Sequence, residues 1–154
     1  MASKYLFNAS KLVGTFMQYA CVLHCICEYV GDIVVCSGPS MEPTLHSNDV
    51  LIIDRISVKL QKIKKGDIII SKCPSNPKQH ICKRVIGLPG DLVRPGVIIP
   101  NGHVWLEGDN STNSTDSREY GPVPQGLLRG RALCKVWPIR DRTLFTSEYM
   151  QSDQ

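Results

Sequence analysis

The sequence lacks a run of about 20 uninterrupted apolar residues, an internal repeat and a strong excess of one charge. Its net charge of +4 over 154 residues is too diffuse to indicate nucleic-acid binding. The seven cysteines contain no C-x-x-C pair, so we expect neither a metal nor another cofactor. One disulfide stays open as an alternative, between Cys73 and Cys82. A G-x-S-x-G nucleophile elbow is also missing, although four histidines are present.

Residues 12–35 form the most apolar part of the chain. Residues 12–27 carry no charge, but two acidic residues then interrupt the stretch, which leaves it short for a full membrane span. Lys4 and Lys11 precede it, and positive charge before such a segment predicts that the N-terminus stays inside while the remainder crosses. We favour a single weak transmembrane anchor. An amphipathic helix on a membrane or a partner and a buried soluble helix are the alternatives.

The remainder of the chain shows short runs of Val and Ile separated by Gly, Pro, Asn and Asp, and no useful helix-period pattern. This spacing predicts a mainly β domain, either a distorted barrel or packed sheets, with an apolar helix before it. The predicted strand runs cover residues 50–53, 68–70, 81–86, 97–99, 104–106 and 132–137.

Ser40 and Lys83 are candidates for a nucleophile and its base. Ser40 lies in a turn after Gly and Pro, and Lys83 lies in an apolar strand with Ile81 and Val85 on the same face. A free lysine has a pKa of about 10.4, so only about one in 2,500 is neutral at pH 7. Burial among apolar side chains would lower that pKa and allow a lysine to accept the serine proton. A Ser–Lys pair of this kind can transfer an acyl group without histidine.

Several runs, taken in order, resemble the type I signal peptidase family of membrane-bound Ser–Lys endopeptidases. They are Ser-Gly-Pro-Ser-Met-Glu-Pro-Thr-Leu at 37–45, Gly-Asp-Ile-Ile at 66–69, Lys-Arg-Val-Ile-Gly-Leu-Pro-Gly-Asp at 83–91, and the stretch from Gly-Asp-Asn to Asp-Ser-Arg at 108–118. The resemblance covers about residues 34 to 125. It implies a signal-peptidase-like distorted β-barrel or packed antiparallel sheets.

The resemblance assigns roles to five residues. It implies that Ser40 is the nucleophile and that its backbone N–H contributes to the oxyanion hole. Lys83 would be the general base, and Ser114 would hydrogen-bond and orient it. Asp116 and Arg118 would hold the loop around the site as a supporting ion pair.

Two further points concern the substrate side. Many bacterial members place a serine hydroxyl two residues before the nucleophile, whereas this chain has Gly38, so that side-chain donor to the oxyanion is missing. A backbone group or a water molecule stays open as its replacement. The family binds its substrate as an extended strand, with small side chains before the cut in shallow pockets. We therefore expect Ile86 and Met41, together with residues 34–36, to form pocket walls.

The chain lacks the large inserted second domain of many bacterial members, and residues 102–110 are similar to the mitochondrial inner-membrane branch. The retained Asp-Ser-Arg loop resembles the first of that branch's two subunits. The resemblance implies a serine endopeptidase that removes hydrophobic sorting sequences from precursor proteins delivered to the intermembrane space. It would reside in the mitochondrial inner membrane, face that space, and pair with a second subunit as a heterodimer. Three regions follow: a membrane-associating helix at 1–30, a peptidase domain at 31–142 and a polar tail at 143–154.

Three other interpretations remain open. The chain could be a non-catalytic binding or scaffold subunit of a peptidase complex that keeps these motifs for folding. It could be an autoproteolytic regulator similar to LexA, although residues 12–27 do not suit a DNA-binding helix-turn-helix. A histidine-based hydrolase is the third, with His24, His46, His80 and His103 as its sources of a base.

Overall fold

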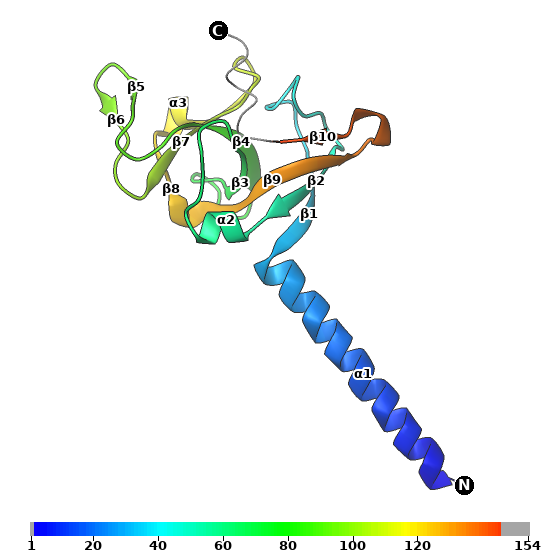
Figure 1. Ribbon diagram of the computed structural model, residues 1–154. Coiled ribbons are helices and arrows are strands. Elements are labelled where there is room, and N and C mark those ends of the chain that lie inside the picture. Colours follow the sequence, from blue (N-terminus) through cyan, green and yellow to red (C-terminus); the bar gives the residue numbers. More distant parts are fainter. Residues whose placement is uncertain (1, 146–154) are drawn as a thin grey trace.

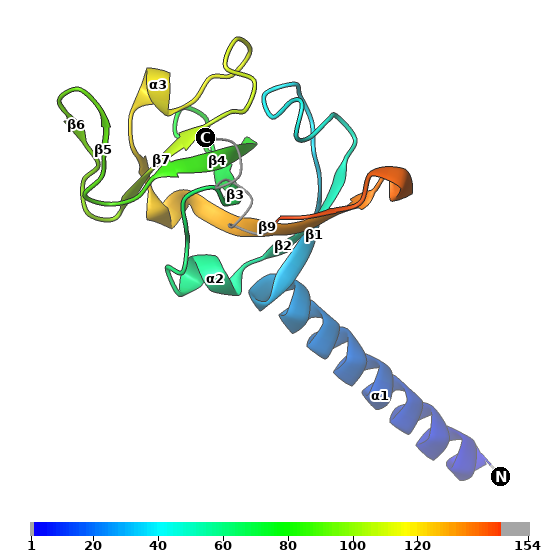
Figure 2. The ribbon, with the colours of Figure 1, turned by 45° about the horizontal axis from the view of Figure 1, so that its top comes forward.

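The computed structural model describes residues 2–145, with side chains described from Lys11 onward. A long N-terminal helix, α1 (Ala2–Tyr29), projects away from a β-rich body in both views (Figures 1 and 2). Its large apolar side chains from Leu12 to Tyr29 are exposed to solvent, with Leu12 73% and Phe16 71% exposed. Within residues 2–145, no helix combines the length and apolar character required to span a bilayer.

The body is one curled antiparallel sheet with β1 at one edge and β8 at the other (Figure 1). The strands of its main path follow the spatial order β1, β2, β9, β3, β4, β7, β8, and a short β10 pairs with β9 outside that path. Their bounds are β1 (Gly31–Val35), β2 (Val50–Asp54), β3 (Ile68–Lys72), β4 (His80–Gly87), β7 (His103–Glu107), β8 (Val123–Pro124), β9 (Leu128–Trp137) and β10 (Thr143–Leu144).

The remaining elements are short and lie on the connections. A separate two-stranded hairpin consists of β5 (Leu92–Arg94) and β6 (Val97–Ile98). The helical turns are α2 (Ile56–Lys59), α3 (Ser117–Tyr120), η1 (Gln125–Leu127) and η2 (Ile139–Asp141).

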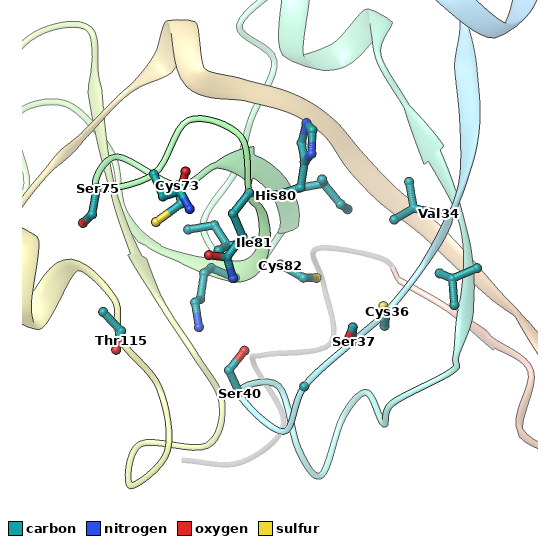
Figure 3. Close-up of a pocket in the computed structure, with 16 residues that line it drawn as sticks. Val34, Cys36, Ser37, Ser40, Cys73, Ser75, His80, Ile81, Cys82 and Thr115 are labelled. Carbon is teal, nitrogen blue, oxygen red and sulfur yellow. The ribbon is translucent and has the colours of Figure 1, made fainter.

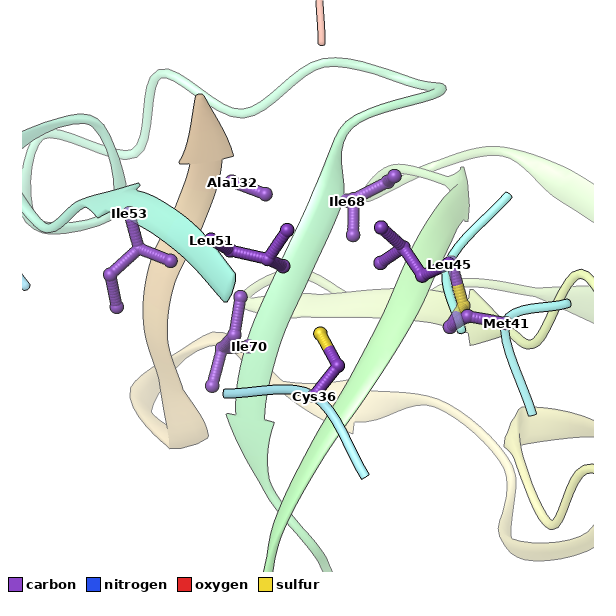
Figure 4. Packing of buried hydrophobic residues seen from close by; sticks show 8 residues of the cluster. All are labelled: Cys36, Met41, Leu45, Leu51, Ile53, Ile68, Ile70 and Ala132. Atoms are coloured by element: carbon purple, nitrogen blue, oxygen red, sulfur yellow. The ribbon is translucent and has the colours of Figure 1, made fainter. Parts of the chain in front are cut away.

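The central strand β3 is buried on both faces, which explains its unbroken run of isoleucines. Successive side chains of a strand point to opposite faces, so Ile68 and Ile70 enter one hydrophobic cluster while Ile69 enters another. The first cluster packs between the β1–β2–β9–β3 part of the sheet and the segment after β1 (Figure 4). Its members are Cys36, Met41, Leu45, Leu51, Ile53, Ile68, Ile70 and Ala132.

The second cluster packs around β3, β4, β7 and β8 and includes Val85 beside Lys83. The turn at Gly66 feeds β3, and its φ of 89° is a conformation that favours glycine. The N–H of Gly66 donates to the Val85 carbonyl, and the Val85 N–H donates to the Asp67 carbonyl. These two hydrogen bonds hold the turn against β4 at Val85, two residues after Lys83.

The prediction of a mainly β fold is confirmed, and each predicted run contributes to a strand. Two elements differ from expectation. Strand β1 lies within the apolar stretch that the sequence attached to the N-terminal helix. The predicted tail begins with β10, and Phe145 then donates its N–H to Leu133 and packs against the first cluster. The rest of that tail lies outside the described residues.

Candidate active site

A pocket of about 470 Å³ lies between the segment after β1 and the first half of β4, and both Ser40 and Lys83 line it (Figure 3). In Figure 3 the Ser40 side chain points into this space from its turn, with Cys82 and Ile81 across from it. The lining residues are Val34, Val35, Cys36, Ser37, Gly38, Ser40, Ile70, Cys73, Ser75, Asn76, Gln79, His80, Ile81, Cys82, Lys83 and Thr115.

The Ser40 turn is fastened to the loop that follows β7. Asn110 donates its backbone N–H to the Ser40 carbonyl at 3.1 Å and its side-chain Nδ2 to the Pro39 carbonyl at 3.1 Å. Gly108 lies so close that a Cβ there would be 2.4 Å from the Ser40 carbonyl oxygen and 2.3 Å from Ser114 Oγ. A residue without a side chain is therefore required where the two loops meet.

Lys83, Ser114 and Asp116 form a hydrogen-bonded relay. Lys83 Nζ donates to Ser114 Oγ at 2.8 Å, and Ser114 Oγ donates to Asp116 Oδ2 at 2.7 Å. The direction of the second bond is fixed because an ionised carboxylate can only accept. Within the described part of the chain, no hydrogen bond joins Lys83 Nζ to Ser40 Oγ.

Asp116 is fully buried, and several donors compensate its charge. Arg118 binds it through Nε at 2.8 Å and through a terminal nitrogen at 2.5 Å, and the Gly108 N–H donates to Oδ2 at 2.9 Å. Burial by itself raises the pKa of Asp116, but the hydrogen bonds from Arg118, Gly108 and Ser114 outweigh it and hold the pKa well below the usual range. Asp116 is therefore an anion at neutral pH.

Lys83 is only 3% exposed, and burial lowers the pKa of its amino group. The nearby Asp116 carboxylate opposes part of this lowering, while the Arg118 guanidinium adds to it. Lys83 makes no direct ion pair among residues 11–145, since a hydroxyl separates it from the carboxylate. Its ammonium form is poorly compensated, which favours the neutral amine.

The next residue on β4, Arg84, points away from the pocket and forms a bidentate pair with Asp109 at 2.8 and 2.6 Å. It also donates to the Gly66 carbonyl at 3.0 Å and to Thr44 Oγ1 at 3.4 Å. Paired planar groups of this kind give rigid geometry. Arg84 thus connects the segment that carries Ser40, the turn before β3 and the loop after β7.

Comparison with known proteins assigns the family. Residues 9–97 and 92–137 match the family described as "Signal peptidase, peptidase S26". The chain belongs to this signal peptidase family. It is a serine peptidase, and the activity predicted from the sequence is therefore confirmed at this level.

Relatives at high identity carry the name mitochondrial inner membrane protease. The chain is 51% identical to subunit 1 of this protease from Mus musculus over 145 residues, which cover 88% of this chain and 87% of that protein. It is 52% identical to subunit 1 from Homo sapiens over 140 residues, covering 85% and 84%. It is also 39% identical to subunit 2 from Saccharomyces cerevisiae over 131 residues, covering 76% and 74%.

The structure brings most of the predicted signal peptidase residues together, and of the predicted pocket walls residues 34–36 line the pocket while Met41 and Ile86 do not. Ser40, Lys83 and the Ser114–Asp116–Arg118 group meet at one end of the pocket. Met41 is 3% exposed and packs in the first cluster beside Leu45, and Ile86 is exposed outside the pocket lining. Met41 therefore takes a core position, because the turn that exposes Ser40 directs the next side chain inward.

The backbone N–H groups of Gly38 and Ser40 lie next to the pocket and are candidates for the predicted oxyanion hole. Gly38 donates its N–H to Ser47 Oγ at 3.1 Å, so this backbone group already has a partner. Over residues 11–145, no protein acceptor faces the Ser40 N–H. Asn110 was not predicted to bridge the two loops, because its contacts to Pro39 and Ser40 span about seventy residues. Its place in the Gly-Asp-Asn motif was the one available signal.

The cysteines are all free, so Cys73 and Cys82 do not form the disulfide that the sequence left open. Cys82 instead packs against the cluster that contains Cys36. The histidines do not form a base for Ser40 either. His80, at the start of β4, lines the pocket but is exposed, and the hydrogen bond recorded for His103 goes to the Asn101 carbonyl at 3.1 Å.

Proposed function

We propose that this signal peptidase cleaves peptides with a Ser–Lys dyad in which Ser40 is the nucleophile and Lys83 is the general base. The observation that carries the proposal is the relay from Lys83 through Ser114 to a permanently ionised Asp116, in the pocket that Ser40 also lines.

The relay determines how Lys83 can act. Ser114 has one hydroxyl proton, and it goes to Asp116, so Ser114 can only accept from Lys83. A neutral Lys83 amine has two N–H donors and one lone pair. One N–H binds Ser114, and the lone pair remains for a proton from the pocket side. Ser114 is thus a positioning residue that leaves the amine ready to accept the Ser40 proton.

Catalysis then follows two acyl-transfer steps. Ser40 Oγ attacks the scissile carbonyl carbon while its proton moves to Lys83 Nζ. The resulting ammonium returns that proton to the departing amine nitrogen, which leaves an ester on Ser40. Lys83 next takes a proton from water, the hydroxide adds to the ester carbonyl, and the proton returns to Ser40 Oγ as the acid product leaves.

The tetrahedral intermediate of each step carries a negative oxygen, and we assign the Ser40 N–H to it. Support comes from the absence of a protein acceptor for that N–H over residues 11–145. Removing one oxyanion donor typically costs about 10²–10³ in kcat.

The substrate would enter as an extended strand. Strand β1 pairs only with β2 among the described strands, and β4 pairs with β7 from Arg84 onward but not over residues 80–83. Both free edges border the pocket, so an extended peptide can hydrogen-bond to main chain on either side. Of the expected walls, Val34 and Cys36 would then flank the side chains next to the cut, with Ile81 in place of Met41 and Ile86.

The biological substrates proposed here are precursor proteins with hydrophobic sorting sequences, cleaved at the mitochondrial inner membrane on the intermembrane-space side. Support comes from the names of the relatives and from the exposed apolar side chains of α1, which suit a membrane environment. Relatives exist as subunit 1 and subunit 2, which supports a heterodimer with a second subunit.

A direct test uses the full chain, with and without the second subunit, on a precursor carrying a sorting sequence. Ser40→Ala should abolish cleavage, and mass spectrometry should find an acyl adduct on Ser40 of the wild type after reaction with an electrophilic ester probe. Cleavage that persists in the assembled Ser40→Ala complex would assign catalysis to the other subunit and leave this chain a scaffold.

A further inference from the structure

Two thiols lie on the chain segments that carry the proposed nucleophile and base, and both line the pocket. Cys36 is the first residue after β1, four positions before Ser40, and Cys82 immediately precedes Lys83 on β4. Cys82 packs against the hydrophobic cluster of which Cys36 is a member, and both line the pocket. Figure 3 shows the two side chains facing one another across this pocket.

Buried cysteines usually act as small apolar side chains, and here Cys36 does contribute to the core. Reactivity requires a thiolate and access in addition. A hydrogen bond from the Cys82 thiol lowers the pKa of Cys36, and burial adds to that same bond in raising the pKa of Cys82. The pocket supplies access from solvent. The pair therefore combines one activated thiol with a neighbour able to resolve a mixed disulfide.

We propose that Cys36 and Cys82 form a reversible disulfide with a small disulfide oxidant such as oxidised glutathione, and that this bond switches the peptidase off. The inference rests on the Ser40–Lys83 function proposed above, because its consequence is a loss of that activity.

The chemistry balances in two exchanges. The Cys36 thiolate attacks one sulfur of oxidised glutathione, forming a mixed disulfide and releasing one glutathione thiolate. Cys82 then loses its proton and attacks the Cys36 sulfur, which releases the second glutathione. Two protein thiols are oxidised to one disulfide, and one glutathione disulfide is reduced to two thiols. Excess reduced thiol reverses both steps.

The Cys36–Cys82 disulfide would inhibit the peptidase by moving the segments that carry Ser40 and Lys83. Sulfurs in a disulfide are about 2.05 Å apart, well inside the contact distance of two thiols, so the segments on either side must draw together. Those segments carry Ser40 and Lys83, and a misplacement of about 1 Å near reacting groups can cost about 10²-fold in rate. The disulfide would also fill the space between β1 and β4 that the substrate strand enters.

The test treats the detergent-solubilised full chain with oxidised glutathione and follows two readouts. Intact-mass and peptide mapping should show a Cys36–Cys82 crosslink, lighter by the mass of two hydrogen atoms. Activity should fall by about tenfold or more relative to the reduced sample and return with dithiothreitol.

Matched variants separate the outcomes. Cys36→Ser should lose the crosslink and keep the same activity before and after oxidation. Cys82→Ser should also lose the crosslink but stop at the mixed disulfide on Cys36, heavier by one glutathione. Cys73→Ser, which removes another pocket-lining thiol, should remain as sensitive as the wild type. A crosslink absent from the wild-type map, or inhibition that persists in Cys36→Ser, overturns the inference. An inactive reduced wild type would instead reject the proposed peptidase function.

Discussion

Lys83 and Lys135 are two buried lysines in one sheet, and they differ in what faces the ammonium group. Each is 3% exposed, Lys83 on β4 and Lys135 on β9. Lys83 donates to a hydroxyl, whereas Lys135 pairs with the Asp49 carboxylate at 3.4 Å and bonds directly to Asp141.

The difference appears in the two pKa values. Burial acts to lower both, but it prevails only at Lys83. At Lys135 the carboxylates of Asp141 and Asp49 outweigh burial, so the pKa rises. Placing an amine inside a protein is therefore insufficient to produce a base. The amine must also be kept one hydrogen bond away from the nearest carboxylate, which is what Ser114 does for Lys83.

The largest expected effect comes from removing the amine. Lys83→Met should lower kcat/KM by about 10⁴-fold, since it removes the amine that accepts the Ser40 proton in the proposed dyad. Lys83→Arg should be equally inactive, because a guanidinium cannot lose its proton at any working pH. The matched control is Lys135→Met, which should keep its activity per folded molecule. Activity of Lys83→Arg within tenfold of wild type would contradict the base assignment.

The same two substitutions should rank in the opposite order when the free energy of unfolding is measured, with Lys135→Met the more damaging. Lys135→Met leaves Asp49 buried without its cation, so the free energy of unfolding should fall by about 3 kcal/mol at most, as Asp141 is solvent-exposed. Lys83→Met removes a charge that burial disfavours, and it should be neutral or stabilising at pH 7. Urea unfolding of both variants measures this comparison.

The pH dependence of that second measurement has a definite sign. Folding lowers the pKa of Lys83, so the wild type carries an unfavourable contribution while the unfolded lysine is protonated. This contribution disappears as the pH rises past the unfolded value of about 10.4. Any stability advantage of Lys83→Met should therefore shrink between neutral and alkaline pH. A constant advantage would mean that packing, rather than charge, explains it.

The sequence could indicate the residues of the proposed dyad but not how the side chains around them pack. Ser40, Lys83 and Ser114 lie in motifs with fixed local spacing, and strands such as Ile68–Ile70 follow from short apolar runs. Met41 was misplaced because apolar periodicity in a turn does not reveal which way the side chain faces. Strand β1 was missed because it lies at the end of the same apolar stretch as α1, interrupted only by Glu28 and Asp32.

The contact between Lys135 and Asp49 was equally invisible in the sequence. It joins β9 to the loop before β2, and only the folded sheet brings them together. In the sequence, Lys83 and Lys135 have the same local pattern, a lysine within an apolar strand. The family motif, not the local pattern, separated Lys83 from Lys135.

The pH–rate profile offers a further way to sharpen the comparison. In the wild type, kcat/KM should rise with pH through the lowered pKa of Lys83. Asp116→Asn removes a charge that raises this pKa, so the midpoint should move to lower pH while kcat falls by about 10²-fold from lost orientation. Arg118→Gln removes a charge that lowers it, so its midpoint should move to higher pH. Opposite shifts are diagnostic, and shifts in one direction for both variants would refute the electrostatic account.

The smallest effect expected concerns Asn110, which holds the Ser40 turn rather than Lys83. Asn110→Asp keeps the acceptor for Thr112 Oγ1, which donates to Asn110 Oδ1 at 2.9 Å, and replaces the donor to the Pro39 carbonyl with a carboxylate oxygen that repels it. Loss of this bond should reduce kcat by about tenfold with little change in KM, because the turn is loosened while the substrate edges remain intact. Thr112→Val is the control and should stay near wild type. If Asn110→Asp is fully active, the backbone bond from Asn110 N–H to Ser40 suffices to hold the nucleophile, and the precision of the site depends on the lysine side alone.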